Sequence, residues 1–204
     1  MKKHALIGLF AMTASASALA IPVTDVQDYS NNTATEYFVD IDANKYNSPY
    51  YRNWSQDWTW THDAIAGSFS SIELEVSAFD VDAVCSGSCE EDMISIWDGS
   101  SWVGFGNLDG ANDLWDFTTF DLTSFSWAEA QVNAGLQVAI DIDVLNAGWL
   151  VTLGKATLSV DGGSQTCVPT PGVPCTPANV PEPAGLALLG LGLAAVGFGR
   201  RRKA

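Results

Sequence analysis

Positive charge is almost missing from the central part of this chain. Between residues 21 and 180 there are three basic side chains, Lys45, Arg52 and Lys155, against 17 Asp and 6 Glu. So acidic a segment is repelled by nucleic-acid phosphates and by anionic lipid surfaces, which excludes nucleic acid as a partner. The same charge attracts cations, divalent ones above all, and keeps the segment soluble.

Histidine is equally scarce, because His62 is the only one after the first twenty residues. A histidine beside Asp63 can act as a general base, but no serine in a nucleophile elbow accompanies it. We therefore interpret His62 as a hydrogen-bonded structural residue at a strand end. Sequence alone selects no carboxylate pair for glycoside hydrolysis. We expect no enzyme activity, and a secreted polysaccharide-acting hydrolase is the alternative.

Cysteine occurs four times, in two close pairs, Cys85/Cys89 and Cys167/Cys175. The spacings do not fit a zinc ligand set. In an exported protein, cysteines meet an oxidising compartment. We predict that each pair closes a local disulfide loop, although the sequence leaves the connectivity open.

Residues 1–20 have the three parts of a secretory signal peptide. Two lysines come first, an apolar segment follows, and the small residues Ala18 and Ala20 stand at the end. This order predicts export and cleavage by signal peptidase after Ala20.

Residues 181–204 form a second targeting segment. An uncharged stretch, 184–199, would span about 24 Å as a helix at ~1.5 Å per residue, which is short of the ~30 Å hydrocarbon core of a bilayer. Basic residues after it are expected on the cytoplasmic side of the inner membrane, with the acidic body outside. The polar residues that frame the stretch are Pro181, Glu182, Pro183, Arg200, Arg201 and Arg202.

This tail resembles the PEP-CTERM sorting signal in the order of its three parts. The resemblance implies recognition by an exosortase, a membrane-embedded cysteine transpeptidase or protease of Gram-negative bacteria. It also implies removal of the tail near the triplet and transfer to the cell surface or the exopolysaccharide matrix. A C-terminal anchor that is never cut is the alternative.

The body, residues 21–161, has the alternation of apolar and polar residues that is typical of half-buried strands. Turn signals recur about every ten residues, which favours an antiparallel sandwich. We predict an all-β fold, a jelly-roll-like β-sandwich over roughly Tyr37–Asp161, with helical character only near Trp127–Gln131. The expected strand regions are Ser71–Asp82, Met93–Gly106, Leu114–Leu122, Leu136–Leu145 and Gly148–Val160.

More loosely, the body resembles the β-sandwich ectodomains of many PEP-CTERM proteins. The residues that carry this likeness are Trp60–Asp63, Asp80–Asp82, Asp92–Ile94 and the Asp98-Gly99 turn. That family has no established common activity, so the resemblance implies a fold and not a reaction. The following segment, 162–180, holds four of the eight prolines and is expected to form an extended spacer.

Two groups of residues are candidates for ligand binding. Asp80 and Asp82 share a strand face, and Glu90, Glu91 and Asp92 follow across the Cys85–Cys89 loop, with Asp80, Asp82, Glu91 and Asp92 as the expected ligands. Converging carboxylates suit Ca²⁺, so we predict a calcium site there. A weaker candidate is the turn that contains Asp109, Asn112 and Asp113.

Tryptophan is abundant, and all eight lie in the body. Exposed indole rings can stack on sugars, and Trp97 and Trp102 flank the predicted turn at residues 98–101. We therefore predict that these two rings bind carbohydrate, such as an exopolysaccharide. The sequence as a whole predicts a non-catalytic structural, adhesive or carbohydrate-binding protein of the cell surface or extracellular matrix.

Overall fold

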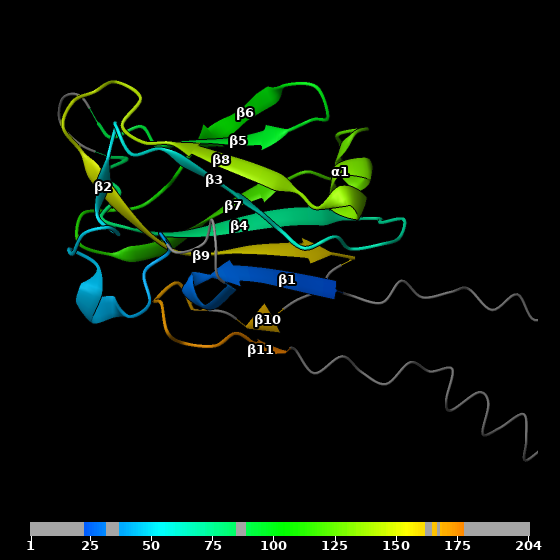
Figure 1. Cartoon of the computed structure of the whole chain (residues 1–204), viewed down its shortest axis with the longest axis horizontal. Helices are drawn as coiled ribbons and strands as arrows, with labels where there is room; N and C mark the ends of the chain where they lie inside the picture. Colours follow the sequence, from blue (N-terminus) through cyan, green and yellow to red (C-terminus); the bar gives the residue numbers. More distant parts are fainter. Residues whose placement is uncertain (1–22, 32–36, 85–88, 162–164, 167, 178–204) are drawn as a thin grey trace, which may run out of the picture. The chain divides into compact units, whose positions relative to one another are not determined.

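The computed structural model describes residues 23–31, 37–84, 89–161, 165–166 and 168–177. All of these belong to one compact unit, Ile21–Pro181, in which two antiparallel sheets face each other (Figure 1). The predicted all-β class is thereby confirmed. The signal peptide and the sorting tail lie outside the described residues, together with Ala18, Ala20, Pro181, Glu182, Pro183, Arg200, Arg201 and Arg202.

Eight main strands build the two sheets. The first sheet has the order β1 (Val23–Asp28), β9 (Leu150–Val160), β4 (Ile72–Phe79), β7 (Trp115–Asp121), with the short β2 (Arg52–Asn53) also paired to β9. The second sheet has the order β3 (Trp58–Thr61), β8 (Gln137–Asp141), β5 (Met93–Trp97), β6 (Trp102–Asn107). The strand pairs are nested in the sequence, because β1 pairs with β9, β3 with β8, β4 with β7 and β5 with β6. One long hairpin rolled into two sheets in this way has the strand pairing of a jelly roll.

The alternation seen in the sequence directs side chains into the space between the sheets. In β4, Ile72, Leu74 and Val76 are buried, whereas Glu73 is exposed. The apolar positions of β5, β8 and β9 meet them from both sheets in one cluster. Phe38 and Trp60 close this core with ring centroids 5.2 Å apart. Burial of these side chains is the main term that stabilises the sandwich.

Strand β9 is buried over nearly its whole length, on both of its faces. The outer face of the first sheet is therefore covered around β9. Phe79 and Trp115 pack there with ring centroids 5.2 Å apart, beneath Tyr46. Residues 168–175, which we call the strap, also lie on this face, since the Ser77 hydroxyl donates to the Pro169 carbonyl and Lys155 Nζ donates to the Val173 carbonyl over 3.0 Å.

The strap differs from the extended spacer expected for 162–180. Its two ends are joined, because β10 (Gln165–Thr166) pairs antiparallel with β11 (Thr176–Pro177), and Figure 1 shows this small pair beside β1 and β9. A glycine at 154 makes room for it. A Cβ there would lie 3.1 Å from the Pro169 carbonyl oxygen and 2.7 Å from Ser77 Oγ.

Several elements depart from the sequence-based expectation. Strand β1 lies before the predicted start of the sandwich, and β8 ends at Asp141 because Asp143 turns the chain with a φ of 48°. The helix α1 (Ala128–Ala134) is longer than a single turn. Two 3-10 turns, η1 (Tyr29–Asn31) and η3 (Asp42–Asn44), complete the described elements. Within the described ranges, none of the helices has both the length and the apolar character needed to cross a membrane.

Candidate functional site

A buried pair of carboxyl groups lies just before β5. Glu90 is 2% exposed and Asp92 is fully buried, because both continue the inward-facing positions of Ile94 and Ile96. The two side chains interact with each other, and Glu90 Oε1 and Asp92 Oδ2 find no donor among the protein groups. Two carboxyl oxygens can bond to each other only when one of them carries a proton.

Two further contacts hold this pair to the surrounding loops. Glu90 Oε2 accepts from the Asp82 amide over 2.8 Å, and Asp92 Oδ1 accepts from the Asp143 amide over 2.8 Å. Burial raises the pKa of both carboxyl groups, since a buried carboxylate loses its hydration. The negative charge of Asp92 raises the pKa of Glu90 further. The site therefore retains a proton well above the pH at which an exposed carboxyl group ionises.

The residues predicted to bind calcium fall into separate groups. Asp80 is engaged on both oxygens, by the Tyr51 hydroxyl over 2.8 Å and by the Asp113 amide over 2.8 Å. Asp82 lies near them, and the negative charges of Asp80 and Asp113 contribute to its raised pKa, after burial. Glu91 is half-buried and its carbonyl accepts from the amide of Val144.

Among the residues that the structure describes, no group of three or more His, Cys, Asp or Glu side chains is arranged to hold a metal ion. Asp92 faces Glu90 and not Asp80, so the four residues predicted as ligands do not share one centre. The residues of the weaker candidate site also have separate contacts. The Asp109 amide donates to the Thr118 hydroxyl, whereas Asp113 lies beside Asp80. Calcium binding stays a prediction.

His62 contacts a polar partner at each of its two ring nitrogens. The side chain is 1% exposed, with Nδ1 2.8 Å from Asp25 Oδ2 and Nε2 3.4 Å from the Trp60 indole nitrogen, which donates to it. Burial tends to raise the pKa of Asp25, but hydrogen bonds from His62 and Gln27 outweigh it and leave that pKa lowered. Both ring nitrogens of His62 are engaged inside the protein, which is the arrangement of a structural histidine.

The cysteines are only partly described. Neither Cys89 nor Cys175 is a free thiol, whereas Cys85 and Cys167 lie outside the described residues. The pairing of the four stays a prediction.

Trp97 and Trp102 do meet across the predicted turn. They are opposite each other in the β5–β6 register, with ring centroids 5.6 Å apart and an interplanar angle of 65°. Trp102 is 42% exposed. The turn between them is built by Asp98, whose Oδ1 accepts from the amides of Ser100 and Ser101, and by Gly99, which has a φ of 103°.

A row of small side chains runs across the second sheet beside these rings. The strand registers place Thr59, Ala139, Ser95 and Gly104 next to one another on β3, β8, β5 and β6. Alternation puts them on the outer side of the sheet, opposite the buried Ile94 and Ile96 positions. A row of small side chains therefore lies beside the two indole rings on the outer face of this sheet.

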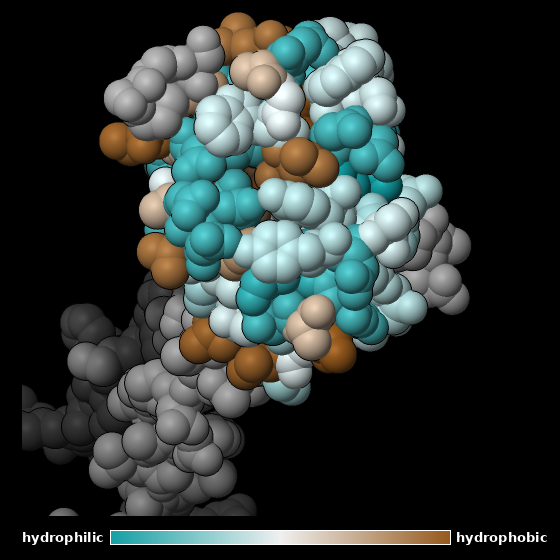
Figure 2. Space-filling model, turned by 90° about the vertical axis from the view of Figure 1, so that its left-hand side faces the viewer, coloured by the Kyte–Doolittle hydropathy of each residue, from teal (hydrophilic) through white to brown (hydrophobic). Residues whose placement is uncertain are grey.

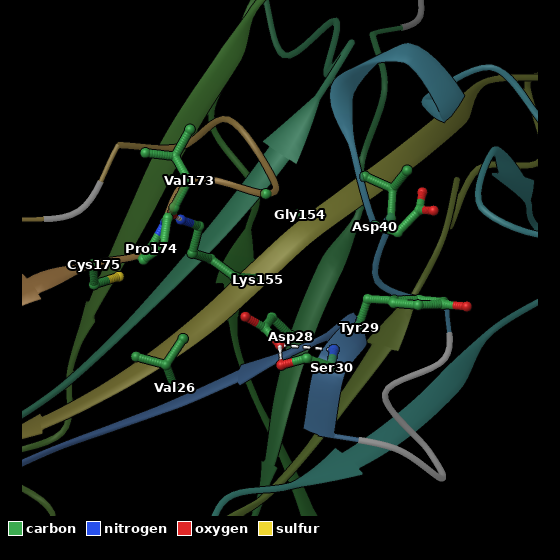
Figure 3. Close-up of a pocket in the computed structure, with 12 residues that line it drawn as sticks. Val26, Asp28, Tyr29, Ser30, Asp40, Gly154, Lys155, Val173, Pro174 and Cys175 are labelled. Atoms are coloured by element: carbon green, nitrogen blue, oxygen red, sulfur yellow. Dashed lines mark hydrogen bonds between the residues drawn. The ribbon is translucent and has the colours of Figure 1, made fainter.

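A cavity of about 420 Å³ lies on the other sheet, next to the strap. Figure 3 shows Tyr29 on one side, Val173 and Pro174 of the strap on the other, and Lys155 between them. Burial lowers the pKa of Lys155, and the charge of Asp28 opposes this change. Two aspartates line the cavity, but both serve nearby turns. Asp28 Oδ1 accepts from the amide and hydroxyl of Ser30, and Asp40 Oδ1 accepts from the Ile41 amide and Asn44.

Sequence reasoning missed Glu90 and Asp143 as buried acids and Asp25 as the partner of His62. The alternation of side chains along the strand could have identified Glu90. Positions 90, 92, 94 and 96 are buried, and the positions between them are half-buried. No pattern in the neighbouring sequence singles out Asp143 or Asp25. The buried Asp143 carboxylate accepts from the amides of Ala147, Gly148 and Trp149. The half-buried Asp25 meets His62, which lies 37 positions away in the chain.

The described body is thus an acidic jelly-roll domain with an aromatic pair on one outer sheet face. Comparison with known families adds the sorting signal. A family model described as the PEP-CTERM protein-sorting motif matches residues 179–203, which confirms the expected motif. No curated protein matches the chain. The motif makes an exosortase the processing partner of this chain and directs it for export and membrane-associated processing toward the surface of a Gram-negative cell.

Proposed function

We propose that this exported protein is a non-catalytic component of the cell surface or exopolysaccharide matrix that binds carbohydrate through its second sheet. The observation that carries the proposal is the Trp97–Trp102 pair, which leaves one indole ring 42% exposed beside a row of small side chains. The faces of indole rings attract the C–H groups of sugar rings. Neighbouring hydroxyl and amide groups, such as Thr59 and Gln137 on exposed positions, supply hydrogen bonds to sugar hydroxyls.

The surface charge supports a neutral or cation-bridged polysaccharide as the ligand. With three basic side chains in residues 21–180, direct pairing with an anionic polymer is unfavourable. Figure 2 shows one end of the domain, where hydrophilic residues predominate and hydrophobic ones are scattered. Stacking on the tryptophans is the specific attraction in this proposal.

The test measures binding of the exported protein to exopolysaccharide from its own host by affinity electrophoresis. We expect Trp102→Ala to weaken binding about tenfold, which is the loss of about 1.4 kcal/mol typical of a stacked aromatic contact. Trp97→Ala is expected to weaken it similarly, since Trp97 supports the Trp102 ring.

Trp54→Ala is the matched control, because Trp54 is 53% exposed but lies beside β2 on the first sheet. Equal losses in Trp54→Ala and Trp102→Ala would contradict a specific site on the second sheet. Full binding by the Trp97→Ala, Trp102→Ala double variant would contradict the proposal entirely.

A secreted hydrolase is the second candidate function, and the cavity beside the strap is the observation in its favour. Asp28 and Asp40 both line it, and two carboxyl groups near a sugar can act as acid and base. Release of reducing sugar from the same exopolysaccharide, abolished by Asp28→Asn or Asp40→Asn, would favour this candidate over simple binding.

A further inference from the structure

Two aspartates lie on the outer face of the second sheet, away from Trp102. Asp141 ends β8 and is exposed, because the residues on both sides of it, Ile140 and Ile142, are buried in the core. Asp57 precedes β3 and is exposed as well. Its Oδ1 accepts from the Ile142 amide over 2.9 Å. Burial raises the pKa of Asp141, and the negative charge of Asp57 raises that pKa further, so the two carboxylates are close neighbours.

The Asp141 carboxylate is available to a ligand. Asp57 serves the backbone through one of its oxygens, whereas no residue that the structure describes donates a hydrogen bond to the side chain of Asp141. The three basic side chains of the body all donate to other groups, namely Lys45 to Asp42, Arg52 to Gln56 and Lys155 to Val173. This part of the sheet face is therefore negatively charged.

Ser95 lies in the middle of a diagonal that joins Trp102 to Asp141 across the neighbouring strands β6, β5 and β8 (Figure 1). On one side, Trp102 pairs with Trp97, two residues after Ser95. On the other side, Asp141 pairs with Met93, two residues before Ser95. The diagonal crosses two strand spacings and runs four residues along the strands, which together give a length of about 16 Å.

A glycan with one ring stacked on Trp102 can follow this diagonal. A pyranose ring with its linkage oxygen is about as long as one strand spacing, so the chain reaches Asp141 about three rings later. There, a carboxylate accepts hydrogen bonds from the hydroxyl groups of a neutral sugar. It repels the carboxylate of a uronic acid. The position therefore favours one class of sugar and opposes the other.

We propose that Asp141, together with Asp57, makes the second sheet select neutral glycans and exclude chains that carry uronic acids. Asp141 is the specificity-determining residue, and Asp57 adds a second negative charge beside it. The inference rests on the proposed carbohydrate binding by Trp97 and Trp102, and it adds the class of sugar that the site accepts.

The test compares two forms of the host's exopolysaccharide by affinity electrophoresis of the exported protein in buffer with a chelator. In one form the carboxyl groups have been reduced to alcohols, and in the other the primary hydroxyl groups have been oxidised to carboxylates. We expect the wild type to bind the reduced form about tenfold more tightly. Asp141→Asn is expected to narrow this preference about fivefold, because the repulsion between two charges at ~4 Å in water is lost.

Two matched variants separate the local charge from the net charge of the domain. Asp116→Asn removes the same charge from an exposed position on β7 of the first sheet, so its preference is expected to match that of the wild type. Asp141→Glu retains the charge and is expected to retain the preference.

Each contrary result has its own meaning. Equal binding of both forms by the wild type, or an equal effect of Asp116→Asn and Asp141→Asn, would overturn the selective role of Asp141. If added calcium reversed the preference in the wild type but not in Asp141→Asn, the aspartates would hold a bridging cation instead of excluding uronic acids. Undiminished binding of the reduced form by the Trp97→Ala, Trp102→Ala double variant would contradict the proposed function itself, and the inference with it.

Discussion

The buried contact between Glu90 and Asp92 ties the stability of the domain to pH. Burial raises the pKa of Glu90 to about 9, above the ordinary value of 4.5, so the folded protein holds a proton that the unfolded chain releases. The contribution of such a group to the free energy of unfolding is fully present below its pKa in the unfolded chain. It is lost as pH rises through its pKa in the folded protein. We therefore expect the melting temperature to fall between about pH 4.5 and about pH 9.

Glu90→Gln is the informative variant for this prediction. A glutamine amide donates a hydrogen bond to Asp92 without needing a proton, so the melting temperature of the variant is expected to depend less on pH and to exceed that of the wild type near pH 9. Calorimetric scans at several pH values measure both. A wild-type profile as flat as that of Glu90→Gln would mean that the pair does not hold a proton.

At the scale of whole elements, Gly154 of strand β9 allows the strap to pack closely against the first sheet. Gly154→Ala would place a Cβ 2.7 Å from Ser77 Oγ and 3.1 Å from the backbone oxygen of Pro169. Overpacking of this kind costs about 1–3 kcal/mol, and we expect urea unfolding to show that loss. Gly104→Ala is the control, because its added Cβ meets the flexible end of Met93 at 3.1 Å. Equal stability of the two variants would contradict close packing of the strap.

Element by element, the sequence predicted most strands because their pattern is local. The alternation in β4 and the turn at residues 98–101 are both readable within ten residues, and both are confirmed. Strand β1 was not recognised because only Val23 and Val26 interrupt a polar stretch, and it becomes a strand by pairing with β9. The expected spacer was read from proline content, which says nothing about the Ser77 and Lys155 donors that bind the strap.

For the molecule as a whole, the two targeting segments predict a processed chain. Protein released from the cell surface is expected to begin at Ile21 and to lack Arg200, Arg201 and Arg202, because export removes the first segment and exosortase the second. Mass spectrometry of the released protein measures both ends. Intact protein in the cytosol that retains Met1 and the arginines would contradict the predicted processing at both ends.

The sequence by itself identified the sorting motif and predicted export and a body made of strands, because signal peptides, sorting tails and strand alternation are all patterns between near neighbours in the chain. Only the tertiary structure decided which acids are buried, which tryptophans remain exposed and where the strap lies. Asp92 meets Asp143 across 51 positions and Ser77 meets Pro169 across 92. Contacts over such separations depend on how the two sheets roll together, and no local pattern contains that information.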